Sequence, residues 1–191
     1  MPSGQRPDKG VKRVHLIDQT LDGALLMELF SRDGCGTLVA NDDYESLRSA
    51  NIDDIAGIIE LIRPQEENGT LVKRSRELLE AEIGHFTVIE RDGMIVGCAA
   101  LYPYPDDRAA ELACLSIHPQ YANLGFGDRL LVYIQRQAKQ QGIAKLFALT
   151  TSSAHWFVER GFKVSEQSEL PSKKQALYNY QRNSKVFIKA I

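Results

Sequence analysis

One segment of the sequence has the residue types and spacing of a phosphate-binding loop. An apolar run ending at Ile117 leads through a loop that contains Gly125 and Gly127, and a helical pattern follows at once. The exposed N–H groups of a helix start and the helix dipole suit a phosphate or pyrophosphate. Glycine at both positions would let a ligand approach the backbone closely. Two glycines alone also fit an ordinary turn between a strand and a helix.

The elements that must position this loop follow from the periodicity of the apolar residues. Two apolar runs joined by Asp92-Gly93 predict a hairpin, so the centre of the sheet is antiparallel. A strand, a helix and a strand between Ala109 and Thr150 predict a parallel crossover. The expected class is α/β, with a mixed, mostly antiparallel sheet and helices on both faces. The predicted strands are residues 45–48, 85–90, 94–102, 109–117, 145–150, 162–165 and 184–189, and the predicted helices lie around residues 52–62, 71–83, 130–138 and 155–160.

The N-terminal part of the sequence, positions 1–40, predicts a separate segment. Val14 to Ile17, Leu21 to Phe30 and Thr37 to Ala40 have the pattern of a strand, a helix and a strand, which is too little to build a core alone. We place the boundary at Asn41 to Asp43, before a main domain at positions 44–191.

Composition narrows the class of ligand. The 191 residues carry 23 basic and 25 acidic side chains, a net charge of -2, which favours neither nucleic acid nor a membrane surface as partner. Cys35, Cys98 and Cys114 show no pairing or metal-binding pattern, and the four histidines lack metal-ligand spacing. We expect no metal, no signal peptide or membrane span, and a soluble protein of the reducing cytoplasm.

The flanking residues of the glycine loop resemble the acetyl-CoA-binding motif of the GNAT superfamily, in which a strand, Arg/Gln-x-x-Gly-x-Gly/Ala and a helix follow one another. Ala122, Gly125 and Gly127 occupy the motif positions, and Ala122 departs from the usual Arg or Gln. The resemblance covers residues 44–191 and implies the GNAT fold, with acetyl-CoA as co-substrate. The cofactor-binding residues that it implies are Leu115, Ile117, Asn123, Leu124, Gly125, Phe126 and Gly127.

Further segments resemble the acetyltransferase domain of the bacterial N-acetylglutamate synthase family. They are Glu111 to Leu115, Leu146 to Thr151, His155 to Phe162, Ile62 to Pro64 and Arg182 to Ser184. Residues 11–40 resemble the last part of that family's amino acid kinase-like domain, most of which is absent, so the sequence is either a fragment or a short family member. The resemblance implies direct transfer of acetyl to the α-amine of L-glutamate, the first step of arginine biosynthesis.

This chemistry assigns roles to particular residues. An α-amine is mostly protonated at neutral pH, so a general base is needed, and the resemblance places Glu111 in that role. A tyrosine that protonates the leaving thiolate in many GNAT enzymes is replaced by Phe157, and Thr150 offers a hydroxyl instead. The GNAT resemblance also implies a bulge near Cys114 and Leu115, which would supply an N–H group for the oxyanion.

Two carboxylates on glutamate require at least two cations, and arginine suits bidentate binding. Lys73, Arg74 and Arg182 are the favoured candidates, and Lys174 is a weaker one. Two alternatives stay open: a GNAT enzyme that acetylates another small or protein amine, and a catalytically silent acyl-CoA-binding module. A homo-oligomer also stays open.

Overall fold

The computed structural model describes residues 13–31, 34–40, 45–179 and 182–191. The chain separates into two compact units, Met1–Glu45 and Ser46–Ile191. The boundary predicted at Asn41 to Asp43 lies outside the described residues. Each unit is described by itself below.

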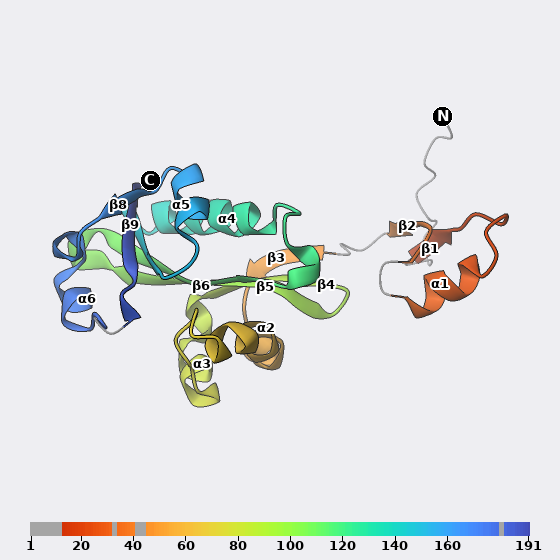
Figure 1. The fold of residues 1–191 in the computed structure, drawn as a ribbon, viewed down its shortest axis with the longest axis horizontal. Coiled ribbons are helices and arrows are strands. Elements are labelled where there is room, and N and C mark those ends of the chain that lie inside the picture. Colours follow the sequence, from red (N-terminus) through yellow and green to blue (C-terminus); the bar gives the residue numbers. More distant parts are fainter. Residues whose placement is uncertain (1–12, 32–33, 41–44, 180–181) are drawn as a thin grey trace. The chain divides into compact units, whose positions relative to one another are not determined.

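The first unit has a two-stranded antiparallel sheet and one helix. β1 (Arg13–Leu16) pairs with β2 (Thr37–Ala40), and α1 (Ala24–Phe30) lies between them in the chain (Figure 1). The predicted order of strand, helix and strand is confirmed. The Glu28 carboxylate links the three elements, because it accepts hydrogen bonds from the backbone N–H groups of Cys35 and Gly36, both at 2.8 Å, and contacts the His15 ring.

The second unit is built on a seven-stranded mixed sheet with the order β3-β4-β5-β6-β7-β9-β8. The β6–β7 pair is parallel, and the other pairs from β4 to β8 are antiparallel, which confirms the predicted mixed sheet and crossover. The strands are β3 (Glu45–Ser49), β4 (Phe86–Arg91), β5 (Met94–Tyr104), β6 (Ala109–Ile117), β7 (Lys145–Thr150), β8 (Lys163–Ser165) and β9 (Lys185–Ala190).

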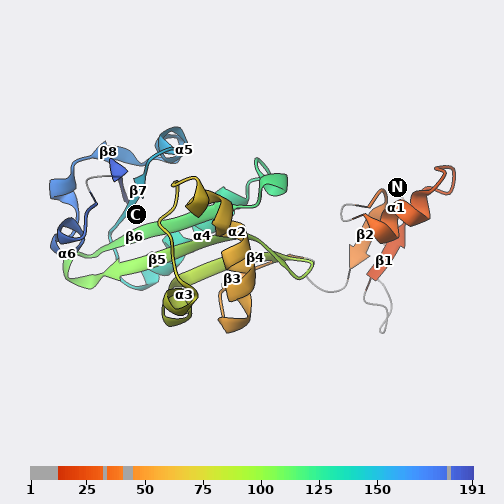
Figure 2. The ribbon, with the colours of Figure 1, turned by 60° about the horizontal axis from the view of Figure 1, so that its bottom comes forward.

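Helices cover both faces of this sheet (Figures 1 and 2). One layer contains α4 and α5, and the opposite layer contains α2 and α3. Their bounds, with that of α6 near the end of the chain, are α2 (Ile55–Glu67), α3 (Arg76–Glu82), α4 (Phe126–Gln140), α5 (Ala154–Glu159) and α6 (Ser172–Ala176).

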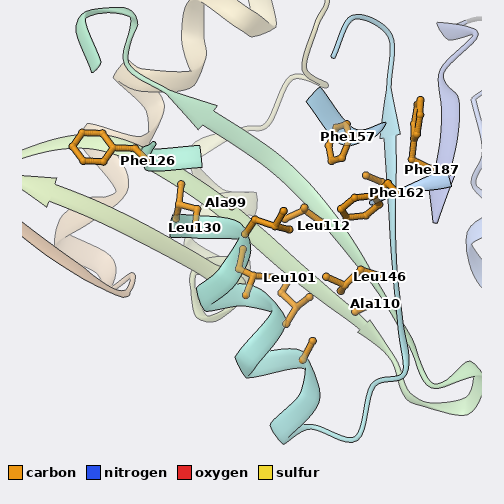
Figure 3. Packing of buried hydrophobic residues seen from close by; sticks show 14 of the residues in the cluster. Ala99, Leu101, Ala110, Leu112, Phe126, Leu130, Leu146, Phe157, Phe162 and Phe187 are labelled. Carbon is orange, nitrogen blue, oxygen red and sulfur yellow. The ribbon is translucent and has the colours of Figure 1, made fainter. Parts of the chain in front are cut away.

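Each helix layer encloses an apolar core. Leu130, Leu131, Ile134 and Ala138 of α4 are all buried against the sheet, as the helical spacing predicted. Figure 3 shows this cluster, in which three phenylalanines from α5, the following segment and β9 gather at one end. On the other face, Ile55, Ile58 and Ile62 of α2 pack on β4 and β5, whereas Ile52 precedes the helix and is exposed. Gly57 of α2 approaches β5 so closely that an added Cβ would lie 2.7 Å from the Ile95 side chain.

The helix predicted over residues 71–83 is wrong at its start. α3 begins only at Arg76, because the Ser75 hydroxyl accepts a hydrogen bond from the N–H of Leu78 and caps the helix there. Upstream, the Glu66 carboxylate accepts the N–H of Arg74 at 2.9 Å. Residues 70–75 are therefore held in an irregular segment. The short helix α6 was not predicted.

A charged contact joins the start of the second unit to the sheet. Arg48 of β3 donates to both carboxylate oxygens of the buried Asp54, at 2.6 and 2.9 Å, and to Glu90 of β4 at 2.6 Å. The hydrogen bonds from Arg48 lower the pKa of Asp54. Removing Arg48 would leave a buried carboxylate with only the N–H of Asn51 as its partner. Within the ranges described, no helix is long and apolar enough to cross a membrane.

Substituting Arg48→Met should lower the free energy of unfolding by about 2 kcal/mol at pH 7, because Asp54 loses its cation. Since the pKa of Asp54 is lowered from its ordinary 3.8, this contribution is present above that pH and is lost as the pH falls below it. Urea denaturation at several pH values measures the difference. Arg76→Met, which breaks the exposed pair with Glu80, is the control and should have a much smaller effect, because solvent screens that pair. Equal losses in both variants would contradict the assignment.

Candidate functional site: two adjoining cavities at the parting of β6 and β7

The two parallel strands at the centre of the sheet separate part of the way along their length. β6 and β7 are paired only at Ala109–Lys145, Ala110–Leu146 and Glu111–Phe147. Beyond Glu111, β6 continues to Ile117 on its β5 side, and β7 continues to Thr150 on its β9 side. The edge of β6 that would face β7 is therefore open to an extended ligand, which can pair with it as an added strand.

A β-bulge lies on β6 at this opening. Ala113 pairs with Ala100 and Ser116 pairs with Cys98, so that two residues, Cys114 and Leu115, face one residue of β5. Cys114 has a φ of 52°. This left-handed conformation is uncommon for a residue other than glycine. A bulge re-aims the backbone beside it. The bulge predicted near Cys114 and Leu115 is confirmed.

The first cavity occupies the opening and has a volume of about 430 Å³. Of the predicted cofactor-binding residues, Leu115, Ile117 and Gly127 line it, together with Thr150. The remaining lining residues are Gln65, Thr70, Leu71, Leu112, Ala113, Cys114, Leu149, Ser153, Trp156 and Phe157. This mostly apolar wall suits an extended, weakly polar chain such as a pantetheine arm.

The glycine loop ends at the N-terminus of α4. Gly125 precedes the helix with a φ of 79°. It has no side chain that could cap the helix, so the first N–H groups lack a side-chain acceptor from that position. A Cβ at Gly125 would meet no protein atom within 4 Å, so its backbone conformation is what requires glycine there. Asn123 and Leu124 are exposed, and Phe126 is buried in the core, so only its main chain is available to a ligand.

The second cavity has a volume of about 740 Å³ and adjoins the first, because Thr70, Leu71, Ala113, Cys114 and Leu149 line both. It contains Glu111 and all the predicted cations, which come from two distant parts of the chain. These cations are Lys73, Arg74, Lys174 and Arg182. The second cavity thus places Glu111 and four cationic side chains beside the opening between β6 and β7, together with the carboxylates of Glu66 and Glu82.

Glu111 is buried and already paired. Lys174 of α6 contacts its carboxylate at 2.7 Å, and the Lys174 and Glu111 side chains are 19% and 10% exposed. The ammonium group of Lys174 therefore binds the predicted base in this structure. Tyr104 lies on the same side of the sheet, and burial and the charge of Glu111 raise the pKa of its hydroxyl to about 12, so it stays neutral.

The two arginines are fixed by the backbone around them. Arg182 donates through Nη2 to the carbonyls of Gly69 and Thr70, at 3.3 and 2.7 Å, and so holds the irregular segment before α3. Arg74 donates to the carbonyl of Val72 at 3.0 Å. Burial alone would lower the pKa of Arg74, but the neighbouring Cys114 and Tyr102 side chains outweigh it, the pKa is raised, and the guanidinium stays charged.

Thr150 lies at the end of β7, and its hydroxyl binds the backbone just before α5. Its Oγ1 accepts hydrogen bonds from the N–H groups of Ser152 and Ser153, at 3.3 and 3.0 Å. A hydroxyl has two acceptor lone pairs and one hydrogen, so the hydrogen remains to be donated. Phe157 packs between Phe162 and Phe187 in the core and has no hydroxyl to give.

Sequence reasoning missed several residues of the site. Tyr102 of β5 pairs with Glu111 of β6, and its hydroxyl donates to Glu82 at 2.6 Å. Burial and that hydrogen bond raise the pKa of Tyr102. The alternation of Tyr102 and Tyr104 along one strand was an available signal, since alternate residues of a strand share a face. Trp156 lies in the segment His155 to Phe162, but no role was predicted for it, although it lines the first cavity.

A hollow elsewhere on the second unit exceeds both cavities in volume. A hollow of about 860 Å³ lies along β8 and β9 and is lined by His155, Glu166, Lys185 and neighbours, but by none of the predicted site residues. Over the described part of the chain, no three His, Cys, Asp or Glu side chains gather as metal ligands would. Cys98 and Cys114 are buried free thiols, and Cys35 is half-buried.

Known proteins match both the sequence and the arrangement. The acetyltransferase (GNAT) family model matches residues 52–162. An amino-acid acetyltransferase of Pectobacterium carotovorum is 58% identical over 179 residues, which are 94% of this chain and 41% of that protein. The N-acetylglutamate synthase of Neisseria gonorrhoeae, solved with coenzyme A and N-acetyl-glutamate, has a TM-score of 0.74 at 43% identity and covers 95% of this chain. The same synthase solved with coenzyme A and L-arginine has a TM-score of 0.85 at 42% identity, again over 95% of this chain.

This chain spans less than half the length of those relatives, 41% of the Pectobacterium protein and 41% to 43% of the Neisseria chains. The family model nevertheless covers more than half of this chain, including β6, the glycine loop and α4. By that match and by the open edge of β6, the chain belongs to the acetyltransferase (GNAT) family.

Proposed function

We propose that this protein transfers acetyl from acetyl-CoA to the α-amine of L-glutamate and releases N-acetyl-L-glutamate and CoA. The observation that carries the proposal is the position of Glu111, a buried carboxylate in a cavity with four cationic side chains that opens into the cleft between β6 and β7. The relatives named amino-acid acetyltransferase support the reaction, and the synthase crystallised with N-acetyl-glutamate supports the acceptor.

To bind acetyl-CoA, the protein needs a place for the extended pantetheine arm and an anion site for the pyrophosphate. The open edge of β6 from Leu115 to Ile117 would pair with the amides of the pantetheine arm. The N–H groups at the start of α4 would bind the pyrophosphate. Because main-chain groups supply this binding, Ala122 in place of the usual Arg or Gln removes a side chain but leaves the amides in place.

The acceptor side needs charge and a base. Arg74, Arg182 and Lys73 would bind the two carboxylates of glutamate, which leaves the α-amine near Glu111. Glu111 would accept a proton from the α-ammonium group, directly or through one water molecule. Lys174 keeps the Glu111 carboxylate in place until the acceptor arrives.

The free amine would then attack the carbonyl carbon of the thioester. A backbone N–H at the Cys114 bulge would bind the oxyanion of the tetrahedral intermediate. As the C–S bond breaks, the thiolate of CoA would receive a hydrogen bond from the Thr150 hydroxyl, whose lone pairs two backbone N–H groups already occupy. Those N–H groups also favour negative charge on Oγ1, which makes Thr150 a better donor.

We further infer that the enzyme acts in the cytoplasm, where its three free cysteines stay reduced. The segment of residues 13–40 stays assigned, by resemblance, to the end of a kinase-like domain.

Replacing the base should abolish most of the activity. Glu111→Gln should lower kcat by about 10² to 10⁴-fold, because the ammonium group of glutamate then has no proton acceptor. Initial rates of N-acetylglutamate formation, measured by mass spectrometry, test this. Glu82→Gln removes a carboxylate charge from the same cavity and should keep kcat within about fivefold. An unchanged rate in Glu111→Gln would remove Glu111 from the mechanism.

The acceptor can be tested at Arg74. Arg74→Met should raise the KM for glutamate by about 10- to 100-fold, because a charged hydrogen bond to a carboxylate is lost, while the KM for acetyl-CoA stays unchanged. Arg76→Met, two positions away and outside the cavity, is the matched control. If another amine is acetylated and Arg74→Met leaves its KM unchanged, the GNAT chemistry stands and glutamate is the wrong acceptor. CoA binding without any acetylated product would identify a silent module.

Two substitutions of Thr150 test whether its hydroxyl donates to the leaving thiolate. Thr150→Ser keeps the hydroxyl and should keep kcat within about threefold, whereas Thr150→Val removes it and should lower kcat by about tenfold or more. Single-turnover rates and thermal unfolding of both variants test the role, because the loss of the two N–H contacts to Oγ1 would also destabilise α5. Equal single-turnover rates in Ser and Val would exclude the hydroxyl.

A further inference from the structure

A carboxylate lies where the structure should receive an anion. Asp128 belongs to the first turn of α4 and follows directly after the glycine loop. The positive end of the helix dipole attracts a carboxylate as it attracts a phosphate. An unpaired Asp128 would therefore compete for the same N–H groups and would repel the pyrophosphate of CoA.

Arg160, at the end of α5, pairs with this carboxylate in a two-point contact. Its Nε and Nη2 atoms donate to the two oxygens of Asp128, at 2.5 and 3.0 Å. The hydrogen bonds from Arg160 lower the pKa of Asp128. Arg160 also contacts Glu159 at 3.2 Å, so one guanidinium is shared between two carboxylates. The Arg160 side chain is 22% exposed and that of Asp128 is 50% exposed, so solvent screens the pair in part.

The same guanidinium stacks on a residue that lines the first cavity. Its central carbon is 4.1 Å from the centre of the Trp156 ring, and Nη1 donates to the Trp156 carbonyl at 3.0 Å. Trp156 in turn lies against Gly127, where an added Cβ would be 3.1 Å from the indole ring. Trp156 and Gly127 both line the 430 Å³ cavity. Arg160 thus connects Trp156 of α5 to Asp128 in the first turn of α4.

We propose that Arg160 is a positioning residue for the cofactor, which neutralises Asp128 so that the first turn of α4 can accept the pyrophosphate of CoA. The inference depends on the cofactor half of the proposed function and does not depend on the acceptor. Arg160 acts on the ligand through Asp128, and the stacked Trp156 is held in place as a wall of the cavity.

The structure provides its own reporter of CoA binding. Trp156 is the single tryptophan of the sequence, and it lines the cofactor cavity, so its fluorescence can follow a titration with CoA. Arg160→Met should weaken CoA binding by about tenfold at low salt, because the like charge of Asp128 is exposed to the pyrophosphate. The double variant Asp128→Asn with Arg160→Met should return to within about threefold of the wild-type affinity. Arg160→Lys keeps the charge but loses the two-point contact, so its affinity for CoA should lie between those of the wild type and Arg160→Met.

Rescue is the outcome that a purely structural role would not give. If Arg160 mattered only because it holds Trp156, or because it touched the phosphate itself, the double variant would bind CoA as weakly as Arg160→Met, and the proposal would be overturned. An unchanged affinity in Arg160→Met would overturn it as well. Arg136→Met, which removes a cation from α4 far from its first turn, is the control, and isothermal calorimetry repeats the titrations without relying on the indole.

Asp128→Asn alone keeps the test decisive if Arg160→Met does not fold. With Arg160 still present, this variant should bind CoA at least as tightly as the wild type, and weaker binding would overturn the proposal. A wild-type protein that binds no CoA would overturn the proposed function together with this inference. CoA binding that is unaffected by these substitutions would overturn the inference alone.

Discussion

The separation of β6 from β7 after Glu111 is the constraint on which the site depends. Strands of one sheet normally satisfy each other's N–H and C=O groups, and here β7 turns to β9 while β6 keeps only β5. The unpaired edge is tolerable because a ligand with its own amides can complete it. The bulge at Cys114 belongs to the same feature, since it changes the direction of β6 at the point where the thioester would lie.

In the second cavity, the carboxylate of Glu111 and the cationic side chains around the cavity hold one another and the backbone in place. Glu111 is buried, and a buried carboxylate is stable only with partners, which Lys174 supplies. Arg182 and Arg74 use part of their donors on backbone carbonyls, so their positions are fixed before any substrate arrives. Fixed cations need little reorganisation when a dicarboxylate binds, and such preorganisation is where an enzyme gains most of its electrostatic stabilisation.

Much of this could be predicted from the sequence, because local signals dominate in the sheet and around the glycine loop. The Asp92-Gly93 turn, the apolar stripe of α4 and the left-handed Gly125 before α4 each require only nearby residues. The error over residues 71–75 has the opposite origin. Their helical pattern is overridden by Glu66 and by Arg182, which is far away in the chain. For the same reason the pairing of Lys174 with Glu111 could not be read from spacing.

The two halves of the site therefore differ in how far apart their parts lie in the chain. The first cavity is made mainly by β6, the glycine loop, α4 and β7, which follow one another between Ala109 and Thr150. The second cavity also contains Arg182, near the end of the chain, which donates hydrogen bonds to the carbonyls of Gly69 and Thr70. Contacts of such long separation form late, since a large loop must close before they can stabilise the fold. On the ribosome, a nascent chain would thus form most of the first cavity before it could close the second.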